Sequence, residues 1–180
     1  MKEEEIRPQE VFDEYLRLAK IDIDTYFKDV PNEHVQCPAC NSEGDHTFNK
    51  SGFDYSLCPD CNTLYVSPRP EKRAFNQYYT DAPSVEYWAT TFYETTADAR
   101  REKLWKPKAR LIQNTVQRFA SDAEIIDVGG GYGIFAEEIK SLTGKTVTVI
   151  EPSPYLANIC SDRGVDVIEK FMEDLEESEF

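Results

Sequence analysis

The chain has 180 residues, of which 40% are hydrophobic, and it carries a formal net charge of −14. The hydrophobic content is sufficient to bury a core, which excludes an entirely disordered chain, and there is no run of about 18 apolar residues that would predict a membrane span. Because Lys and Arg must neutralise phosphates, so acidic a chain is expected to bind neither nucleic acid nor an anionic membrane.

Composition divides the chain into four expected segments. These are an N-terminal helical segment (1–34), a cysteine-rich module (35–70), a helical connector (71–120) and an α/β domain (121–180). The first begins with charged residues and lacks the apolar stretch of a secretory signal, so a cytoplasmic location is expected. Residues 9–28 are predicted to form a packing helix, since apolar residues recur there at helical spacing. They are Val11, Phe12, Tyr15, Leu16 and Leu18.

Residues 35–70 contain two Cys-x-x-Cys pairs among short alternating runs, which predicts a small β-rich module. The pairs are Cys37 with Cys40 and Cys58 with Cys61, and seventeen residues separate them. In a cytosolic chain this spacing indicates a zinc site rather than disulfides. Four thiolates satisfy the tetrahedral coordination of Zn²⁺ and leave no position for water, so the metal is expected to be structural. The alternatives are reduced cysteines without a metal and a redox disulfide.

Other residues near the pairs have simpler interpretations. Each pair is followed by an asparagine, Asn41 or Asn62, which tolerates the left-handed backbone that such a turn often requires. His34 and His46 flank the module and are not needed as ligands. Cys160 stands alone in a predicted helix and is interpreted as a small buried hydrophobic residue.

The connector, residues 71–120, is predicted to be mostly helical and is rich in aromatic residues. Pro107 fits the first turn of a helix that ends near Phe119. Six Lys or Arg residues lie between Arg100 and Arg110, and they are interpreted as the solvated face of a helix. The aromatic residues either form ordinary core or cover a binding site and help to shape an acceptor pocket.

From residue 124 onward, short apolar segments alternate with helical ones. Strands are predicted at 124–128, 146–150 and 165–169, with helices at 134–141 and 154–162. This βαβαβ pattern predicts a parallel sheet. The expected fold class is therefore α/β, with an N-terminal helix, a small zinc-ribbon-like β module, a helical linker and a partial Rossmann-like sheet.

The first of these strands runs into a glycine-rich turn at Gly129, Gly131 and Gly133, where the backbone can bend sharply and approach a ligand. Glu151 ends the second strand, a position that reaches ribose hydroxyls in doubly wound folds. Asp127, just before the glycines, could meet the cationic amino group of a ligand. The pattern predicts a nucleotide site, and a tight turn without a ligand is the alternative.

The glycine spacing discriminates between nucleotides. A dinucleotide fingerprint counted from Gly129 and Gly131 would place its last glycine where this chain has Ile134. An acidic site without a pyrophosphate cradle suits a cationic nucleoside better than NAD. A nucleotide-dependent oxidoreductase is therefore disfavoured.

At these residues the chain resembles the class I S-adenosylmethionine-dependent methyltransferases. The family motif of an acid followed by alternate glycines is matched by Asp127, Gly129, Gly131 and Gly133, and the acid ending strand two is matched by Glu151. The adenine-contacting loop after strand three corresponds loosely to residues 171–175, from which Met172 and Glu173 are carried over. The resemblance implies that these residues hold S-adenosylmethionine.

The order of the motifs along the chain indicates a smaller group within this family. Two Cys-x-x-Cys pairs, the segment 64–70, Tyr78-Tyr79 and then the glycine motif are similar to bacterial methyltransferases with an N-terminal zinc-binding domain, some of which act on sugars. The resemblance covers residues 35–175 and implies methyl transfer to a small-molecule acceptor, with a sugar as one candidate. The alternative is a non-catalytic interaction module that combines a zinc ribbon with half of a nucleotide fold.

The family fold has seven strands in the order 3-2-1-4-5-7-6, and three of them are predicted in this chain. In the family, the residues that bind the acceptor and remove its proton lie mostly on or after strand four, so no catalytic residue is assigned. The first strand would have an unpaired edge, and apolar surface would face water. The chain is therefore expected to be a fragment, an interrupted frame or part of a split assembly, completed by the missing C-terminal half or by an oligomeric partner.

Overall fold

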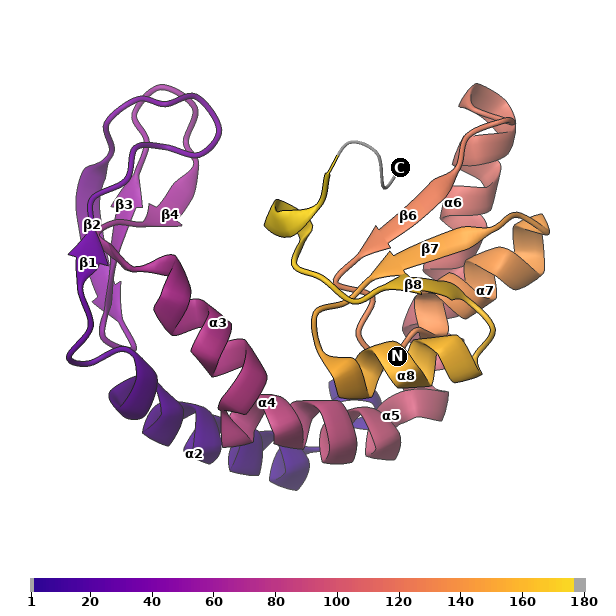
Figure 1. Cartoon of the computed structure of the whole chain (residues 1–180), viewed down its shortest axis with the longest axis horizontal. Coiled ribbons are helices and arrows are strands. Elements are labelled where there is room, and N and C mark those ends of the chain that lie inside the picture. Colours follow the sequence, from indigo (N-terminus) through magenta and orange to yellow (C-terminus); the bar gives the residue numbers. More distant parts are fainter. Residues whose placement is uncertain (1, 177–180) are drawn as a thin grey trace. The chain divides into compact units, whose positions relative to one another are not determined.

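The computed structural model describes residues 2–176. The chain divides into two compact units, one formed by Glu14–Glu86 and the other by Met1–Asp13 with Tyr87–Phe180. Figure 1 shows the elements of both, and each unit is described by itself. Among residues 2–176, no helix is both long enough and apolar enough to cross a membrane.

The unit Glu14–Glu86 combines helices with short antiparallel strands. Its elements are most of helix α2 (Gln9–Tyr26), strands β1 (Asn32–Glu33), β2 (Asp45–Lys50), β3 (Phe53–Leu57), β4 (Leu64–Val66) and β5 (Arg69–Pro70), helix α3 (Lys72–Asp81) and the start of helix α4 (Pro83–Tyr87). Strands β2, β3 and β4 form one antiparallel sheet in that order, and β1 pairs with β5. The predicted β-rich module around the cysteines is therefore confirmed as a set of small antiparallel strands.

A buried polar contact and an aromatic cluster pack the helices of this unit against one another and against β3. Asp22 is 2% exposed and accepts a hydrogen bond of 2.7 Å from the Ser84 backbone N–H, at the start of α4. A carboxylate is favourable there because it satisfies an N–H group that the helix itself leaves unpaired. The ring centroid of Phe27 lies 5.5 Å from that of Phe53 on β3 and 5.0 Å from that of Phe75 on α3. These contacts seat the end of α2 against both elements.

The other unit carries the α/β pattern. Its elements are α1 (Glu3–Ile6), η1 (Trp88–Phe92), α5 (Tyr93–Arg100), η2 (Arg101–Trp105), α6 (Lys106–Phe119), β6 (Ile125–Val128), α7 (Ile134–Thr143), β7 (Val147–Ile150), α8 (Pro154–Asp162), β8 (Asp166–Ile168) and η3 (Met172–Asp174). Helices occupy most of residues 71–120, as the sequence predicted, but η1 and η2 are π-helical turns, which the sequence did not predict. Such turns are frequent at functional sites.

Strands β6, β7 and β8 form a parallel sheet in that order. Each strand and helix of the predicted βαβαβ pattern is found within one or two residues of its expected bounds. Helices α6, α7 and α8 lie on one side of this sheet (Figure 1), and one buried cluster joins them to β7. The cluster includes Ala109, Ala136, Ile139, Val147, Val149 and Cys160.

The apolar residues of β6 are divided between two faces. Ile125 packs against the buried cluster, whereas Ile126 and Val128 are 40% and 55% exposed. Successive side chains of a strand point to opposite faces, and β6 is an edge strand among the described strands. The face of β6 that points away from the cluster is therefore apolar and exposed to solvent. This agrees with the sequence-based expectation that apolar surface beside this edge strand would face water.

Local sequence signals explain the ends of several helices. Helix α7 begins after Gly133 and ends before Gly144, and both glycines have a left-handed backbone. Helix α8 begins after Ser153, whose side chain caps its first turn. Pro107 lies in the first turn of α6, as predicted. Helix α2 ends at Tyr26, two residues before its expected end.

Candidate functional site

The four paired cysteines converge on one point, with all of their Sγ atoms within 4.8 Å of one another. The Sγ of Cys37 is 3.5 Å from that of Cys61, and the Sγ of Cys40 is 3.4 Å from those of Cys58 and Cys61. Four thiolates bound about 2.3 Å from one Zn²⁺ ion would lie about 3.8 Å apart, whereas a disulfide bond is about 2.05 Å long. The cysteines are therefore free and stand in position to hold a metal ion, and this donor set fits Zn²⁺.

Two equivalent turns bring these sulfur atoms together. The Asn41 N–H donates to the Cys37 carbonyl at 2.8 Å, and the Asn62 N–H donates to the Cys58 carbonyl at 3.0 Å. Both asparagines have a φ of 60°, so the predicted left-handed backbone is confirmed at each turn. Asparagine tolerates this conformation because its short polar side chain can hydrogen-bond locally.

Neighbouring side chains shape the cysteine site. Cys37 and Cys58 are buried beside Tyr65. A Cβ atom on Gly44 would lie only 2.5 Å from the Tyr65 hydroxyl oxygen, so the ring can pack there only because residue 44 is glycine. Hydrogen bonds to Cys61, above all from the Thr63 hydroxyl, lower the pKa of this thiol to about 6. A lowered pKa favours the thiolate form that binds metals, whereas burial and hydrogen bonds with Cys40 and Cys61 raise the pKa of Cys58 to about 12.

The two histidines lie outside the cysteine cluster, as expected. The Nε2 atom of His34 is 3.8 Å from a carboxylate oxygen of Glu43, and that of His46 is 3.4 Å from one of Asp54. Both histidine side chains are exposed, so they belong to the polar surface of the unit.

The glycine-rich turn follows β6, as predicted. Gly129, Gly131 and Gly133 have φ values of 70°, 56° and 71°. At Gly131 close packing is a second reason for glycine, because a Cβ atom would lie 2.8 Å from the hydroxyl oxygen of Tyr93. Gly130, which the sequence did not single out, has even less room, since a Cβ atom would lie 2.5 Å from Cγ1 of Val149. The turn is thus determined by packing as well as by backbone conformation.

Glu151 directly follows β7, is 6% exposed, and is held by backbone groups on both sides. Its Oε2 atom accepts a hydrogen bond of 2.9 Å from the Gly131 N–H, and its Oε1 atom accepts one of 3.0 Å from the Ser153 N–H. The carboxylate therefore ties the end of β7 to the glycine turn. Each oxygen keeps a second lone pair that can accept a hydrogen bond from a ligand.

Asp127 lies partly buried on β6, next to the turn. Burial, and then the negative charge of Glu151, raise the pKa of Asp127. Within residues 2–176, Asp127 has neither a hydrogen-bond donor nor a basic partner. A partly desolvated carboxylate is costly without such a partner, and a cationic ligand would relieve the cost.

Cys160 on α8 is buried and contacts the glycine turn through a hydrogen bond. It is 0% exposed, and its Sγ atom donates a hydrogen bond of 3.2 Å to the Gly131 carbonyl. Burial, followed by the charge of Glu151, raises the pKa of Cys160 to about 12, so the residue stays a neutral thiol. The prediction that it is a small buried residue is confirmed.

A cavity of about 240 Å³ opens beside the turn. Asp127, Gly129, Gly130 and Gly133 line it, together with Lys108 and the rings of Tyr93, Trp105, Tyr132 and Phe135. Ligands of parallel α/β sheets bind outside the carboxyl ends of the strands, and this cavity lies at that end of β6. We call it the turn cavity.

Met172 and Glu173 do not line the turn cavity. They lie in η3, after β8, where both side chains are exposed. Of the predicted nucleotide-site residues, Asp127, Gly129 and Gly133 line the turn cavity. Gly131 and Glu151 are joined by a hydrogen bond but are not among the lining residues, and Met172 and Glu173 lie apart from the turn.

Comparisons with known proteins do not assign the chain to a family. No protein-family model matches it. A search of curated proteins gives no match either. A functional assignment therefore depends on the residues and the geometry described above.

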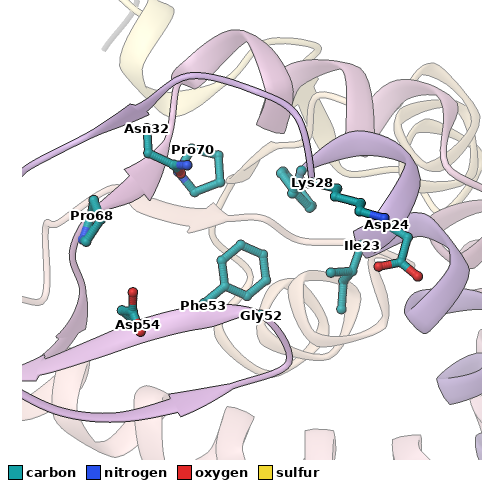
Figure 2. Close-up of a pocket in the computed structure, with 10 residues that line it drawn as sticks. Ile23, Asp24, Lys28, Asn32, Gly52, Phe53, Asp54, Pro68 and Pro70 are labelled. Atoms are coloured by element: carbon teal, nitrogen blue, oxygen red, sulfur yellow. The ribbon is translucent and has the colours of Figure 1, made fainter.

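A second cavity, of about 230 Å³, lies in the unit Glu14–Glu86. Figure 2 shows the Phe53 ring near its centre, with Asp24 and Lys28 on one side and Pro68 and Asp54 on the other. No sequence motif predicted this cavity, because its walls come from the end of α2, the β2–β3 turn and the segment around β5.

Sequence reasoning also missed most of the residues that line the turn cavity, among them Tyr93, Trp105 and Lys108 of the connector. Tyr93 and Trp105 lie in the aromatic-rich connector and Lys108 lies among its six basic residues, and neither pattern distinguishes them from their neighbours. The signal that could have separated them is weak, because which side of a helix faces the turn depends on packing. Their place in the lining shows that the connector contributes to the site.

Proposed function

We propose that this cytoplasmic chain binds S-adenosylmethionine at the glycine-rich turn and supplies the donor-binding half of a methyltransferase for a small-molecule acceptor, with a sugar as one candidate. The observation that carries the proposal is the turn cavity, where the Asp127 carboxylate, which has no hydrogen-bond donor within residues 2–176, stands beside the open backbone of Gly129 at the end of a parallel strand. The resemblance to class I methyltransferases at the same residues supports this reading of the Rossmann-like sheet.

Each residue has a proposed role in holding the methyl donor. Asp127 pairs with the amino group of its methionine portion, and the glycine turn lets the backbone approach. Glu151, already positioned by Gly131, accepts hydrogen bonds from the ribose hydroxyls. Met172 and Glu173 lie near the adenine by analogy with the family.

The reaction itself places modest demands on these residues. A sulfonium donor carries an activated methyl group, so the protein mainly holds donor and acceptor in line. An oxygen or carbon nucleophile also needs a base, and none of the described residues is assigned that role.

We propose a structural role for zinc in the cysteine-rich module. Four thiolates complete a tetrahedral shell, so no position remains for substrate. Metal binding of this kind stabilises small modules by on the order of 10 kcal/mol. Elemental analysis of protein purified without chelator should therefore find one zinc per chain, and Cys58→Ser should lower this content.

Calorimetric titration of the full chain with S-adenosylmethionine, S-adenosylhomocysteine and NAD tests the donor assignment. Binding of the first two alone is the expected result. Binding of NAD alone would indicate an oxidoreductase, and binding of none would contradict the proposal.

A substitution sharpens this test. Glu151→Ala should weaken nucleoside binding by about 1–3 kcal/mol, as expected for loss of a hydrogen bond to a charged group. Because Glu151 also holds the turn, the melting temperature of the variant must be measured alongside. Glu169→Ala removes an exposed acid of the same unit and is the matched control. Unchanged affinity in Glu151→Ala would show that the ribose lies elsewhere.

The open face of β6 favours a second candidate function, that of an interaction module. Ile126 and Val128 are exposed beside an edge of β6 that pairs with no other strand among residues 2–176, and such edges readily pair with further strands. We propose that more protein covers this face, either the remaining strands of the fold or an oligomeric partner. A chain that binds no nucleoside but associates through this edge, and loses association in Val128→Glu, would favour the second function.

A further inference from the structure

The four cysteines of the metal site differ in their exposure to solvent. Cys37 and Cys58, the first residues of the two pairs, are 0% exposed and lie beside Tyr65. Cys40 and Cys61, the second residues of the pairs, are exposed, and their Sγ atoms are 3.4 Å apart. An oxidant dissolved in water therefore meets Cys40 and Cys61 before it meets the covered cysteines.

The exposed pair can form a disulfide bond without a large rearrangement. An S–S bond is about 2.05 Å long, so the two sulfur atoms need to approach each other by about 1.4 Å. Neither Cys40 nor Cys61 lies in a helix or a strand. The approach can therefore be made by the two Cys-x-x-Cys turns while the pairing of the strands is kept.

Exposure and proximity together indicate a site of chemical modification. We propose that Cys40 and Cys61 are oxidised by peroxides to a disulfide, and that this disulfide releases the metal. The inference rests on the structural zinc proposed above. Once Cys40 and Cys61 are joined, Cys37 and Cys58 are the thiolates that remain, and two ligands do not complete a tetrahedral site.

The oxidation proceeds in two steps that balance. In the first step, one thiolate attacks an oxygen of hydrogen peroxide, the O–O bond breaks, and a sulfenic acid and a hydroxide ion form. In the second step, the other thiolate attacks the sulfenic sulfur, the S–S bond forms, and a second hydroxide ion leaves. Two thiolates are thereby oxidised, and one peroxide is reduced to two hydroxide ions.

Loss of the metal should loosen one end of the unit Glu14–Glu86. The buried cluster at the metal site consists of Cys37, Cys58 and Tyr65, so little apolar packing remains there to replace the metal. The β2–β3 turn end of the sheet is held differently, because Phe53 packs against Phe27 of the same unit. Oxidation should therefore speed amide hydrogen exchange in the two Cys-x-x-Cys turns and leave protection around Phe27 unchanged.

The test uses the full chain, loaded with Zn²⁺ and freed of excess metal. The zinc content is measured first, hydrogen peroxide is then added, and released zinc is followed with a chromophoric chelator against a sample without peroxide. About one zinc ion should be released and about two thiols lost per chain. Peptide mapping after the remaining thiols are blocked should find Cys40 linked to Cys61, and a dithiol reductant with added Zn²⁺ should restore the starting state.

Cys160→Ser is the matched control, because it removes the thiol that lies outside the metal cluster. It should release zinc as the unmodified chain does. Retention of zinc after peroxide treatment, release without a disulfide, or a disulfide between any other two cysteines would overturn the inference and leave the structural zinc intact. A chain that holds no zinc before peroxide is added would overturn both the structural zinc and its release.

Discussion

Gly130→Ala is a sharp test of how the glycine turn is held. The added Cβ atom would lie 2.5 Å from Cγ1 and 3.2 Å from Cγ2 of Val149, whose side chain is fully buried on β7. Ordinary contacts begin near 3.4 Å, so turn or strand must shift by about 1 Å. Overpacking of this kind typically costs about 1–3 kcal/mol, which corresponds to a fall in melting temperature of about 2–12 °C.

Gly129→Ala is the matched control, because it should destabilise the fold through backbone strain and not through a steric clash. Nothing lies within 4 Å of a Cβ atom there, but φ is +70°, so the cost is a backbone strain of about 1–2 kcal/mol. Val149→Ala should therefore rescue Gly130→Ala and leave the cost of Gly129→Ala unchanged.

A double-mutant cycle measured by thermal or denaturant unfolding tests whether Val149 packs against Gly130. The coupling between Gly130→Ala and Val149→Ala should be favourable by about 1 kcal/mol or more, and that with Gly129→Ala close to zero. Tolerance of Gly130→Ala, or equal coupling in the two cycles, would refute the close packing of Val149 beneath the turn.

Two further outcomes concern titratable groups. Asp127→Asn should raise the melting temperature at neutral pH, because burial and then Glu151 raise the Asp127 pKa in the folded state, so that ionisation disfavours folding. The gain should decline as the pH falls through that raised pKa and vanish below about 3.9, the ordinary value for unfolded chains; a gain independent of pH would contradict this. In the zinc-loaded chain, a chelator should make four thiols reactive towards Ellman's reagent, while Cys160, buried with a pKa of about 12, should react only on unfolding. Prompt reaction of a fifth thiol would show that Cys160 is accessible.

Several features were predictable from the sequence because they depend on neighbours in the chain. A Cys-x-x-Cys turn positions two sulfurs through backbone geometry alone, and Asn41 and Asn62 confirmed the required left-handed turns. The β–turn–α pattern likewise places Asp127 beside the glycines, because these residues are neighbours in the chain. The alternation of strands and helices indicated the parallel sheet for the same reason, since its period is local.

Tertiary structure alone decided which distant residues complete each site. Packing of Val149 on β7 against the turn leaves no room for a side chain at Gly130, although the motif spacing indicated only Gly129, Gly131 and Gly133. Packing of α6 brings Lys108 into the turn cavity, and the buried carboxylate of Glu151 reaches Gly131 across 20 residues. Sequence spacing describes the direction of a side chain within its own element, whereas contacts between elements depend on how their buried faces fit together.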